Sequence, residues 1–226
     1  MITGEDVTPG DVLIGLPSPG LRSNGYSLAR RLMFDVAGRS VGDPAWDGTD
    51  APTVGDELLV PSVIYAAAIR ALVVAVEVHS IAHITGGGLP GNLNRVLGEH
   101  SDALVDPGSW EWPRIFTELQ RIGDVDVDEM RKVFNLGVGM GVVVPQEAAD
   151  AAMSALARTG VQARRIGRSW RIQSSSSSVI SWMRLRSVTW NASSSACPGM
   201  AVSRRAKMTS PHTMPKHTEK EDMPSI

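Results

Sequence analysis

Three consecutive glycines behind a short apolar run are the sequence feature that most constrains the fold. Ser80 to Ile84 has the composition of a short strand, which ends in Gly86, Gly87 and Gly88. Leu89 to Val96 then reads as a loop that enters a helix. A strand that turns through glycines into a helix indicates a layer of helices on a sheet.

The same alternation of apolar strands and amphipathic helices continues over the first 167 residues. Asp11 to Leu16 is a candidate strand, and apolar spacing of three or four residues predicts helices after it. The residues expected on buried helix faces are Leu28, Leu32 and Val36 in one helix, and Ile64, Ala68, Leu72, Ala75 and Val78 in a second that begins at Pro61. Further candidates are helices at Pro113 to Arg121 and Pro145 to Arg158 and strands at Val142 to Val144 and Val161 to Ile166. We therefore predict an α+β fold whose strand order the pattern leaves open.

Charge and composition change after Gly167 and divide the chain into two regions. Residues 1–167 hold 13 Lys and Arg against 21 Asp and Glu, whereas residues 168–226 hold 9 against 3. The second region is rich in serine, including Ser174 to Ser178, and has no sustained strand or helix period. This composition is typical of a disordered tail or of translation in an unintended reading frame, and a basic interaction tail is the alternative.

Several classes of protein are excluded or disfavoured by simple features. No apolar run is long enough to span a membrane, and the acidic start lacks the features of a secretory signal, so a cytoplasmic protein is expected. Cys197 is the only cysteine, which excludes an internal disulfide and a cysteine-rich zinc site. The basic Arg204 to Lys207 run is too short, and lacks aromatic neighbours, to favour nucleic-acid binding.

The glycine run could bind a phosphate. Glycines let backbone N–H groups approach an anion closely, and the first turn of a helix has unbonded N–H donors. Gly86 to Gly88, with Thr85 before them and Asn92 after them, fit neither the dinucleotide nor the Walker pattern. By local sequence alone, a plain flexible turn is therefore an equal alternative.

A second candidate loop contains Arg22, Ser23 and Asn24. Arg22 could supply a bidentate donor to phosphate, while Ser23 and Asn24 could bond sugar oxygens. The alternative is that Ser23 or Asn24 only caps the following helix, and this segment in isolation favours capping.

His83, directly before the glycine run, is the candidate catalytic residue, although a histidine on an apolar strand is more often structural. His79 suggests a metal site with His83, but acidic residues at ligand spacing are lacking. The acidic stretch of Asp124, Asp126, Asp128 and Glu129 lacks the glycine turn and the distal glutamate of a cation loop, and indicates a solvated loop and the start of a helix. We expect no metal ligands in this chain.

Several segments, taken in order, carry a resemblance to one enzyme family. They are Gly10 to Ile14, Ser23 to Leu28, His83 to Gly88 with Asn92 and Arg95, Gly108 to Trp110 with Pro113 and Phe116, and Phe134 to Met140. Together they resemble the C-terminal domain of aminoimidazole ribonucleotide synthetase, also called phosphoribosylformylglycinamidine cyclo-ligase, over about residues 4–167. The resemblance implies helices packed on a mixed or antiparallel sheet.

The resemblance also implies a reaction of purine biosynthesis. ATP, with Mg²⁺, phosphorylates the formyl amide oxygen of formylglycinamidine ribonucleotide, the amidine nitrogen closes the imidazole ring, and phosphate leaves. It places His83, Ser23, Asn24 and Gly86 to Gly88 beside the substrate, and most ATP and Mg²⁺ ligands in an N-terminal domain expected outside this chain. It implies a phosphoribosyl substrate and a possible homodimer or separately encoded ATP domain as partners.

Two departures from the family limit what the resemblance transfers. Arg22 stands where histidine is common in the family, and the segment before Ile64 and Tyr65 lacks the usual arginine. Because the resemblance places most ATP and Mg²⁺ ligands outside this chain, we expect the chain to be incomplete as an isolated enzyme. The alternative is a non-enzymatic module that binds a phosphorylated ribonucleotide or takes part in assembly.

Overall fold

The computed structural model describes residues 2–98, 101–171 and 189–190, which all lie in one compact unit. Most of the region expected to be a disordered or frame-shifted tail lies outside the described residues. The described residues Arg168 to Arg171 form the end of a strand, four residues beyond the expected boundary at Gly167.

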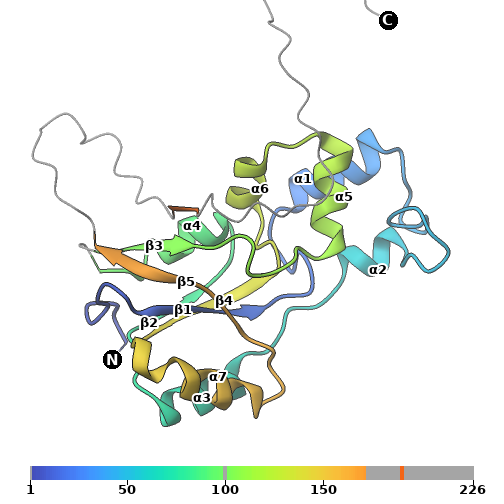
Figure 1. Cartoon of the computed structure of the whole chain (residues 1–226). Coiled ribbons are helices and arrows are strands. Elements are labelled where there is room, and N and C mark those ends of the chain that lie inside the picture. Colours follow the sequence, from blue (N-terminus) through green and yellow to red (C-terminus); the bar gives the residue numbers. More distant parts are fainter. Residues whose placement is uncertain (1, 99–100, 172–188, 191–226) are drawn as a thin grey trace, which may run out of the picture. The chain divides into compact units, whose positions relative to one another are not determined.

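Five strands form an antiparallel sheet in the order β2-β4-β1-β5-β3 (Figure 1). A sixth strand, β6, pairs in parallel with β3, so the sheet of the described residues is mixed. The bounds are β1 Val12–Pro17, β2 Ser80–His83, β3 Ser101–Val105, β4 Val138–Val144, β5 Arg164–Arg171 and β6 Thr189–Trp190. The predicted α+β fold with a mixed or antiparallel sheet is confirmed.

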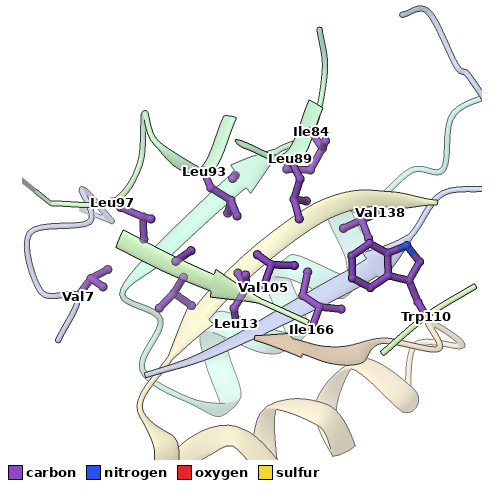
Figure 2. Close-up of a cluster of buried hydrophobic side chains, with 13 residues drawn as sticks. Val7, Leu13, Ile84, Leu89, Leu93, Leu97, Val105, Trp110, Val138 and Ile166 are labelled. Carbon is purple, nitrogen blue, oxygen red and sulfur yellow. The ribbon is translucent and has the colours of Figure 1, made fainter. Parts of the chain in front are cut away.

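Helices cover both faces of this sheet, as Figure 1 shows. On one face lie α3 (Ala66–Ala75) and α7 (Ala149–Ala157), the latter preceded by the short 3-10 helix η2 (Gln146–Ala148). On the other lies α4 (Gly88–Leu93), which follows β2 through the glycines. Alternate residues of β1 serve the two faces: Ile14 and Leu16 pack with α3 and α7, and Leu13 packs with Leu93 of α4. Figure 2 shows the buried cluster that contains Leu13 and Leu93, with Trp110 at one end.

Four α-helices and a π-helix pack together beside the sheet. They are α1 (Tyr26–Arg30), the π-helix η1 (Arg31–Val36), α2 (Val54–Leu58), α5 (Arg114–Gly123) and α6 (Val127–Val133). Phe116 of α5 and Phe134, directly after α6, are fully buried at the centre of this cluster, with ring centroids 5.4 Å apart. Phe134 also leads into the turn that starts β4.

The first expected helix corresponds to α1 and η1, and the prediction of its buried face is wrong at the C-terminal end. Ala29, Leu32 and Met33 are buried, but Val36 is 54% exposed. The reason is the π-helical segment, in which the N–H of Ala37 donates to the carbonyl of Leu32, five residues back, at 2.9 Å. The wider turn rotates later side chains off the 3.6-residue period.

The second expected helix begins later than Pro61. Its first helical residue is Ala66, and Ile64 is 86% exposed because residues 60–64 are not helical. Ala68 and Leu72 are buried as predicted, whereas Ala75 is exposed and Val78 lies beyond the helix. The strand β3, whose second residue is the charged Asp102, was not predicted. No helix in the described part of the chain has the length and apolarity that a membrane span needs.

Candidate functional site

The sheet topology brings the loops after β1 and β2 together. Both strands pair antiparallel with β4, which lies between them, so β1 and β2 run in the same direction. Leu16 at the end of β1 and His83 at the end of β2 are both register partners of Met140. The loops that follow, residues 18–25 and 84–88, therefore leave the sheet at the same edge.

Asn24 and Gly86 mark where the two loops meet. A Cβ atom built on Gly86 would lie 3.6 Å from Oδ1 of Asn24, which is ordinary contact distance. Within the described residues, the backbone N–H groups of Gly86 and Gly87 donate no hydrogen bond, and both glycines are exposed. We call residues 22–25 with residues 84–88 the two-loop site.

Arg22 lies beneath this surface rather than on it. The residue is only 8% exposed and adopts a left-handed backbone conformation with φ of 60°. Its Nη1 lies 3.3 Å from the carbonyl oxygen of Gly139 and 3.0 Å from Nε2 of His83, and its Nη2 donates to the carbonyl of Ile84. Phosphate binding by Arg22 stays a prediction, but the free bidentate guanidinium expected from the sequence is not present, because both terminal nitrogens are engaged.

His83 is the exposed partner of this buried arginine. It is the last residue of β2, where its side chain points away from the buried neighbours Ala82 and Ile84. Partial burial, followed by the positive charge of Arg22, lowers the pKa of His83 below its usual value. The imidazole is therefore neutral at physiological pH.

Thr85 and Asn92 turn their side chains onto the glycine loop itself. The Nδ2 group of buried Asn92 donates to the carbonyl of Gly88 at 2.7 Å and to those of Thr85 and Gly86 at 3.3 Å. The hydroxyl of Thr85 donates to Oδ1 of Asn92 at 3.1 Å. The geometry thus shows Asn92 holding the loop in place, and contact of either side chain with a ligand stays a prediction.

Ser23 and Asn24 do not cap the following helix, so the capping interpretation is wrong. The N-cap of α1 is Gly25, with φ of 77°, and no side chain bonds the first turn. A side chain at Gly25 is excluded because its Cβ would lie 2.3 Å from Cε1 of Phe134. Within the described residues, the side chains of Ser23 and Asn24 make no hydrogen bond. Both remain free to bind a ligand.

The helix that follows the glycines, α4, offers an anion less than the sequence suggested. The six residues of α4 form a helix too short to support a substantial macrodipole. Gly88, at its start, has φ of 60°, and a Cβ there would lie 1.9 Å from the carbonyl oxygen of Arg131. Gly88 is thus required for packing against α6, and the N–H groups of the loop, not those of the helix, are the donors that an anion would meet first.

Tyr65 and Asn135 support the site and were missed by the sequence analysis as site residues. The Tyr65 hydroxyl donates to the carbonyl of Pro17 at 2.7 Å and lies against Gly139. Burial raises the pKa of Tyr65, an effect that the Arg22 charge opposes. Asn135 donates from Nδ2 to the carbonyl of Gly20 at 2.9 Å, tying the first loop to the turn before β4. The only signal for Asn135 was its place in the family segment Phe134 to Met140, and Tyr65 stood only at a departure from the family.

His79 lies at the opposite end of β2 from His83, which argues against a shared metal site. Its Nδ1 lies 2.7 Å from Oδ2 of Asp11, and both residues are buried. Asp126 caps α6 by accepting from the N–H of Asp128 at 2.8 Å, as a loop before a helix predicts. Among the described residues, no group of three or more His, Cys, Asp or Glu side chains could hold a metal ion.

A cavity of about 350 Å³ lies on the other side of β1. Its lining includes Pro17, Ser18, Trp110, Trp112, Arg164 and Ile166, and none of the predicted site residues. It shares no residue with the two-loop site, although Ser18 in its lining belongs to the first loop.

The sequence matches the model of one family of proteins. The model of the AIR synthase related protein, C-terminal domain, matches residues 8–173. The chain belongs to this family. The match extends through β5 to two residues beyond its end.

Two curated relatives and one solved structure add detail. Phosphoribosylformylglycinamidine cyclo-ligase of Myxococcus xanthus (strain DK1622) is 46% identical over 168 residues, which cover 74% of this chain and 48% of that protein. The protein of the same name from Sorangium cellulosum (strain So ce56) is 47% identical over 169 residues, with the same coverage. This chain therefore spans about half the length of these relatives.

The structure of thiamine-monophosphate kinase from Stenotrophomonas maltophilia K279a is similar in fold alone. It has a TM-score of 0.50 and 18% identity, over 76% of this chain and 51% of that chain.

Proposed function

We propose that this chain forms the substrate side of a phosphoribosylformylglycinamidine cyclo-ligase and binds the phosphate of the ribonucleotide at the two-loop site. The observation that carries the proposal is that Asn24 lies beside Gly86 in the loop where the N–H groups of Gly86 and Gly87 are exposed and unbonded. Relatives at 46% and 47% identity with this name support it.

The chemistry of the two-loop site suits a phosphorylated sugar. Backbone N–H groups of glycines donate to phosphate oxygens without obstruction by a Cβ atom. The hydroxyl of Ser23 and the amide of Asn24 donate to, and accept from, ribose hydroxyls or phosphate oxygens. The buried guanidinium of Arg22 adds a positive charge beneath the loops, which favours an anion above them.

The proposed reaction is the ATP-dependent ring closure of formylglycinamidine ribonucleotide to aminoimidazole ribonucleotide in purine biosynthesis. ATP transfers a phosphoryl group to the formyl amide oxygen. The amidine nitrogen then attacks the formyl carbon that bears this oxygen, and phosphate leaves from that carbon. Because the match spans about half of each relative, we propose that this chain performs the reaction only together with the other half. Its own part is to bind and orient the ribonucleotide.

The described residues do not fit a magnesium site. Mg²⁺ binds oxygen ligands, chiefly carboxylates and phosphates, and the described part of the chain has no cluster of acidic side chains that could hold it. We assign no step to a metal in this chain and place the ligands of ATP and Mg²⁺ in the other half.

An assay of ADP formation tests the proposal. The chain is incubated with ATP, Mg²⁺ and formylglycinamidine ribonucleotide, alone and with a separately produced N-terminal half of the Myxococcus xanthus relative. We expect ADP and aminoimidazole ribonucleotide only in the mixture, and loss of both when His83→Ala replaces the wild-type chain. Turnover by the chain alone contradicts the proposal that the reaction requires both halves. Ribonucleotide binding without turnover in the mixture favours the alternative of a non-enzymatic binding module.

A further inference from the structure

The contact between Arg22 and His83 determines which ring nitrogen of the histidine carries its proton. Nη1 of Arg22 lies 3.0 Å from Nε2 of His83. A guanidinium has only donors and stays protonated in proteins, so the partner nitrogen must accept. Nε2 of His83 therefore has no proton, and the single proton of the neutral ring lies on Nδ1.

The surroundings of Arg22 hold this contact in place. The guanidinium is pinned by the carbonyl groups of Gly139 and Ile84, on β4 and directly after β2. Both segments belong to the sheet edge that carries His83, so the arginine and the imidazole are positioned by the same strands. Movement of Arg22 away from His83 would leave buried donors and carbonyl groups unpaired, which costs free energy.

Protonation of His83 is opposed by the same geometry. An imidazolium has donors at both nitrogens, so its Nε2–H would face the N–H of Arg22 in place of a lone pair. The two positive charges would also repel each other. The ring cannot take up a proton at Nε2 unless this contact breaks, so His83 is a poor general base there.

We propose that Arg22 is a positioning residue that fixes His83 as the neutral Nδ1–H tautomer, so that His83 donates a hydrogen bond to an oxygen of the phosphorylated substrate. The tautomer rests on the geometry alone, whereas the substrate oxygen rests on the proposed function. His83 is exposed, and within the described residues its Nδ1 makes no hydrogen bond. This donor suits a phosphate oxygen, or an amide oxygen that gains negative charge during the reaction.

Nuclear magnetic resonance of the histidine side chains tests the tautomer directly in the full chain without ligand. Long-range ¹H–¹⁵N spectra distinguish the two neutral tautomers by the ¹⁵N shifts of the two ring nitrogens. The signals of His83 are assigned by their loss in His83→Gln. We expect an Nδ1–H tautomer in the wild type at a pH of about 8, and a wild-type ring with Nε2–H contradicts the proposal even if no Arg22 variant folds.

Two arginine variants provide the matched comparison. Arg22→Met keeps the length of the side chain but removes all donors, and we expect His83 to shift toward the Nε2–H tautomer and to titrate at a higher pH. Arg95→Met removes an exposed arginine that contacts the loop through Oδ1 of Asn92 at 3.5 Å, and should leave the His83 signals unchanged. The signals of His79, which is bonded to Asp11, should stay constant in both. An unchanged tautomer in folded Arg22→Met overturns the proposal.

Titration with ribose 5-phosphate separates this inference from the proposed function. We expect the Nδ1 resonance of wild-type His83 to shift in a saturable way. If the ring is the Nδ1–H tautomer but the sugar phosphate leaves Nδ1 unmoved, the positioning role of Arg22 stands and the ligand contact fails. If Nδ1 moves but the free ring carries Nε2–H, the ligand contact stands and the positioning role fails.

Discussion

Nδ2 of Asn92 lies 2.7 Å from the carbonyl oxygen of Gly88, and the same amide also reaches the carbonyl groups of Thr85 and Gly86. One buried side chain of α4 therefore holds the glycine loop that precedes its own helix. The residue that the sequence placed in the ligand site is a structural support of that site.

Replacement of Asn92 tests this role. Asn92→Asp keeps the shape of the side chain but removes its donors, so it leaves loop carbonyls unpaired and buries a charge. We expect the free energy of unfolding to fall by about 1–3 kcal/mol or more, measured by urea denaturation. Asn24→Ala is the matched control, because the Asn24 side chain makes no hydrogen bond in the described residues. Its effect should stay within about 0.5 kcal/mol, and equal effects of the two changes contradict the support role.

Two glycines of the same helix should respond in opposite ways to alanine. Gly88→Ala forces a left-handed conformation on alanine and places its Cβ 1.9 Å from the Arg131 carbonyl oxygen, so a loss of at least about 2 kcal/mol is expected. Gly91→Ala meets nothing within 4 Å and should stabilise the helix by about 0.5–1 kcal/mol. Thermal or urea unfolding of both variants measures the difference. A Gly88→Ala protein as stable as wild type contradicts the close packing of α4 on α6.

The lowered pKa of His83 predicts a pH dependence of stability. The unfolded chain binds a proton at His83 near pH 6.5, whereas the folded chain binds it only at lower pH, because burial and the charge of Arg22 oppose it. Stability is therefore lost as the pH falls from about 7.5 through 6.5, and the loss is complete below the folded pKa.

The free energy of unfolding, measured in urea at a pH of about 7.5 and of about 5, isolates this effect when wild type is compared with His83→Gln. Other titrating groups contribute equally to both proteins. The wild type should lose more stability than the variant over this range. A smaller loss in the wild type contradicts the direction of the shift.

Local patterns in the sequence were sufficient to predict β1, β2, the end of β4, α5 and α7, because these segments have apolar runs or amphipathic periods. They failed where tertiary contacts override local preference. In the π-helical segment that exposes Val36, Leu32 and Met33 are buried in the core. The helix α3 begins directly after Tyr65, whose hydroxyl donates to the carbonyl of Pro17. β3 was missed because a strand of five residues is too short to show a clear alternation of apolar and polar residues.

The candidate site was predicted as a set of segments but not as an arrangement. That the loops of Asn24 and Gly86 meet follows from the position of β4 between β1 and β2, and local sequence does not determine strand order. The buried position of Arg22 was not predictable either, since arginine is usually exposed and its bonds here are to backbone carbonyls distant in sequence.

Gly86 offers the most direct test that the two-loop site binds the ribonucleotide. Its φ lies outside the left-handed region, and a Cβ atom there meets only Oδ1 of Asn24 at 3.6 Å, so Gly86→Val places bulk at the site without backbone strain. Gly87, with φ of 94°, lacks this advantage.

The measurement is a calorimetric titration of wild type and Gly86→Val with formylglycinamidine ribonucleotide, with urea unfolding of both proteins alongside. We predict saturable binding to the wild type at one site, at least about tenfold weaker binding to Gly86→Val, which corresponds to about 1.4 kcal/mol, and equal unfolding free energies. Absence of binding to the wild type, or equal binding to both proteins, contradicts the assignment of the ribonucleotide to the two-loop site.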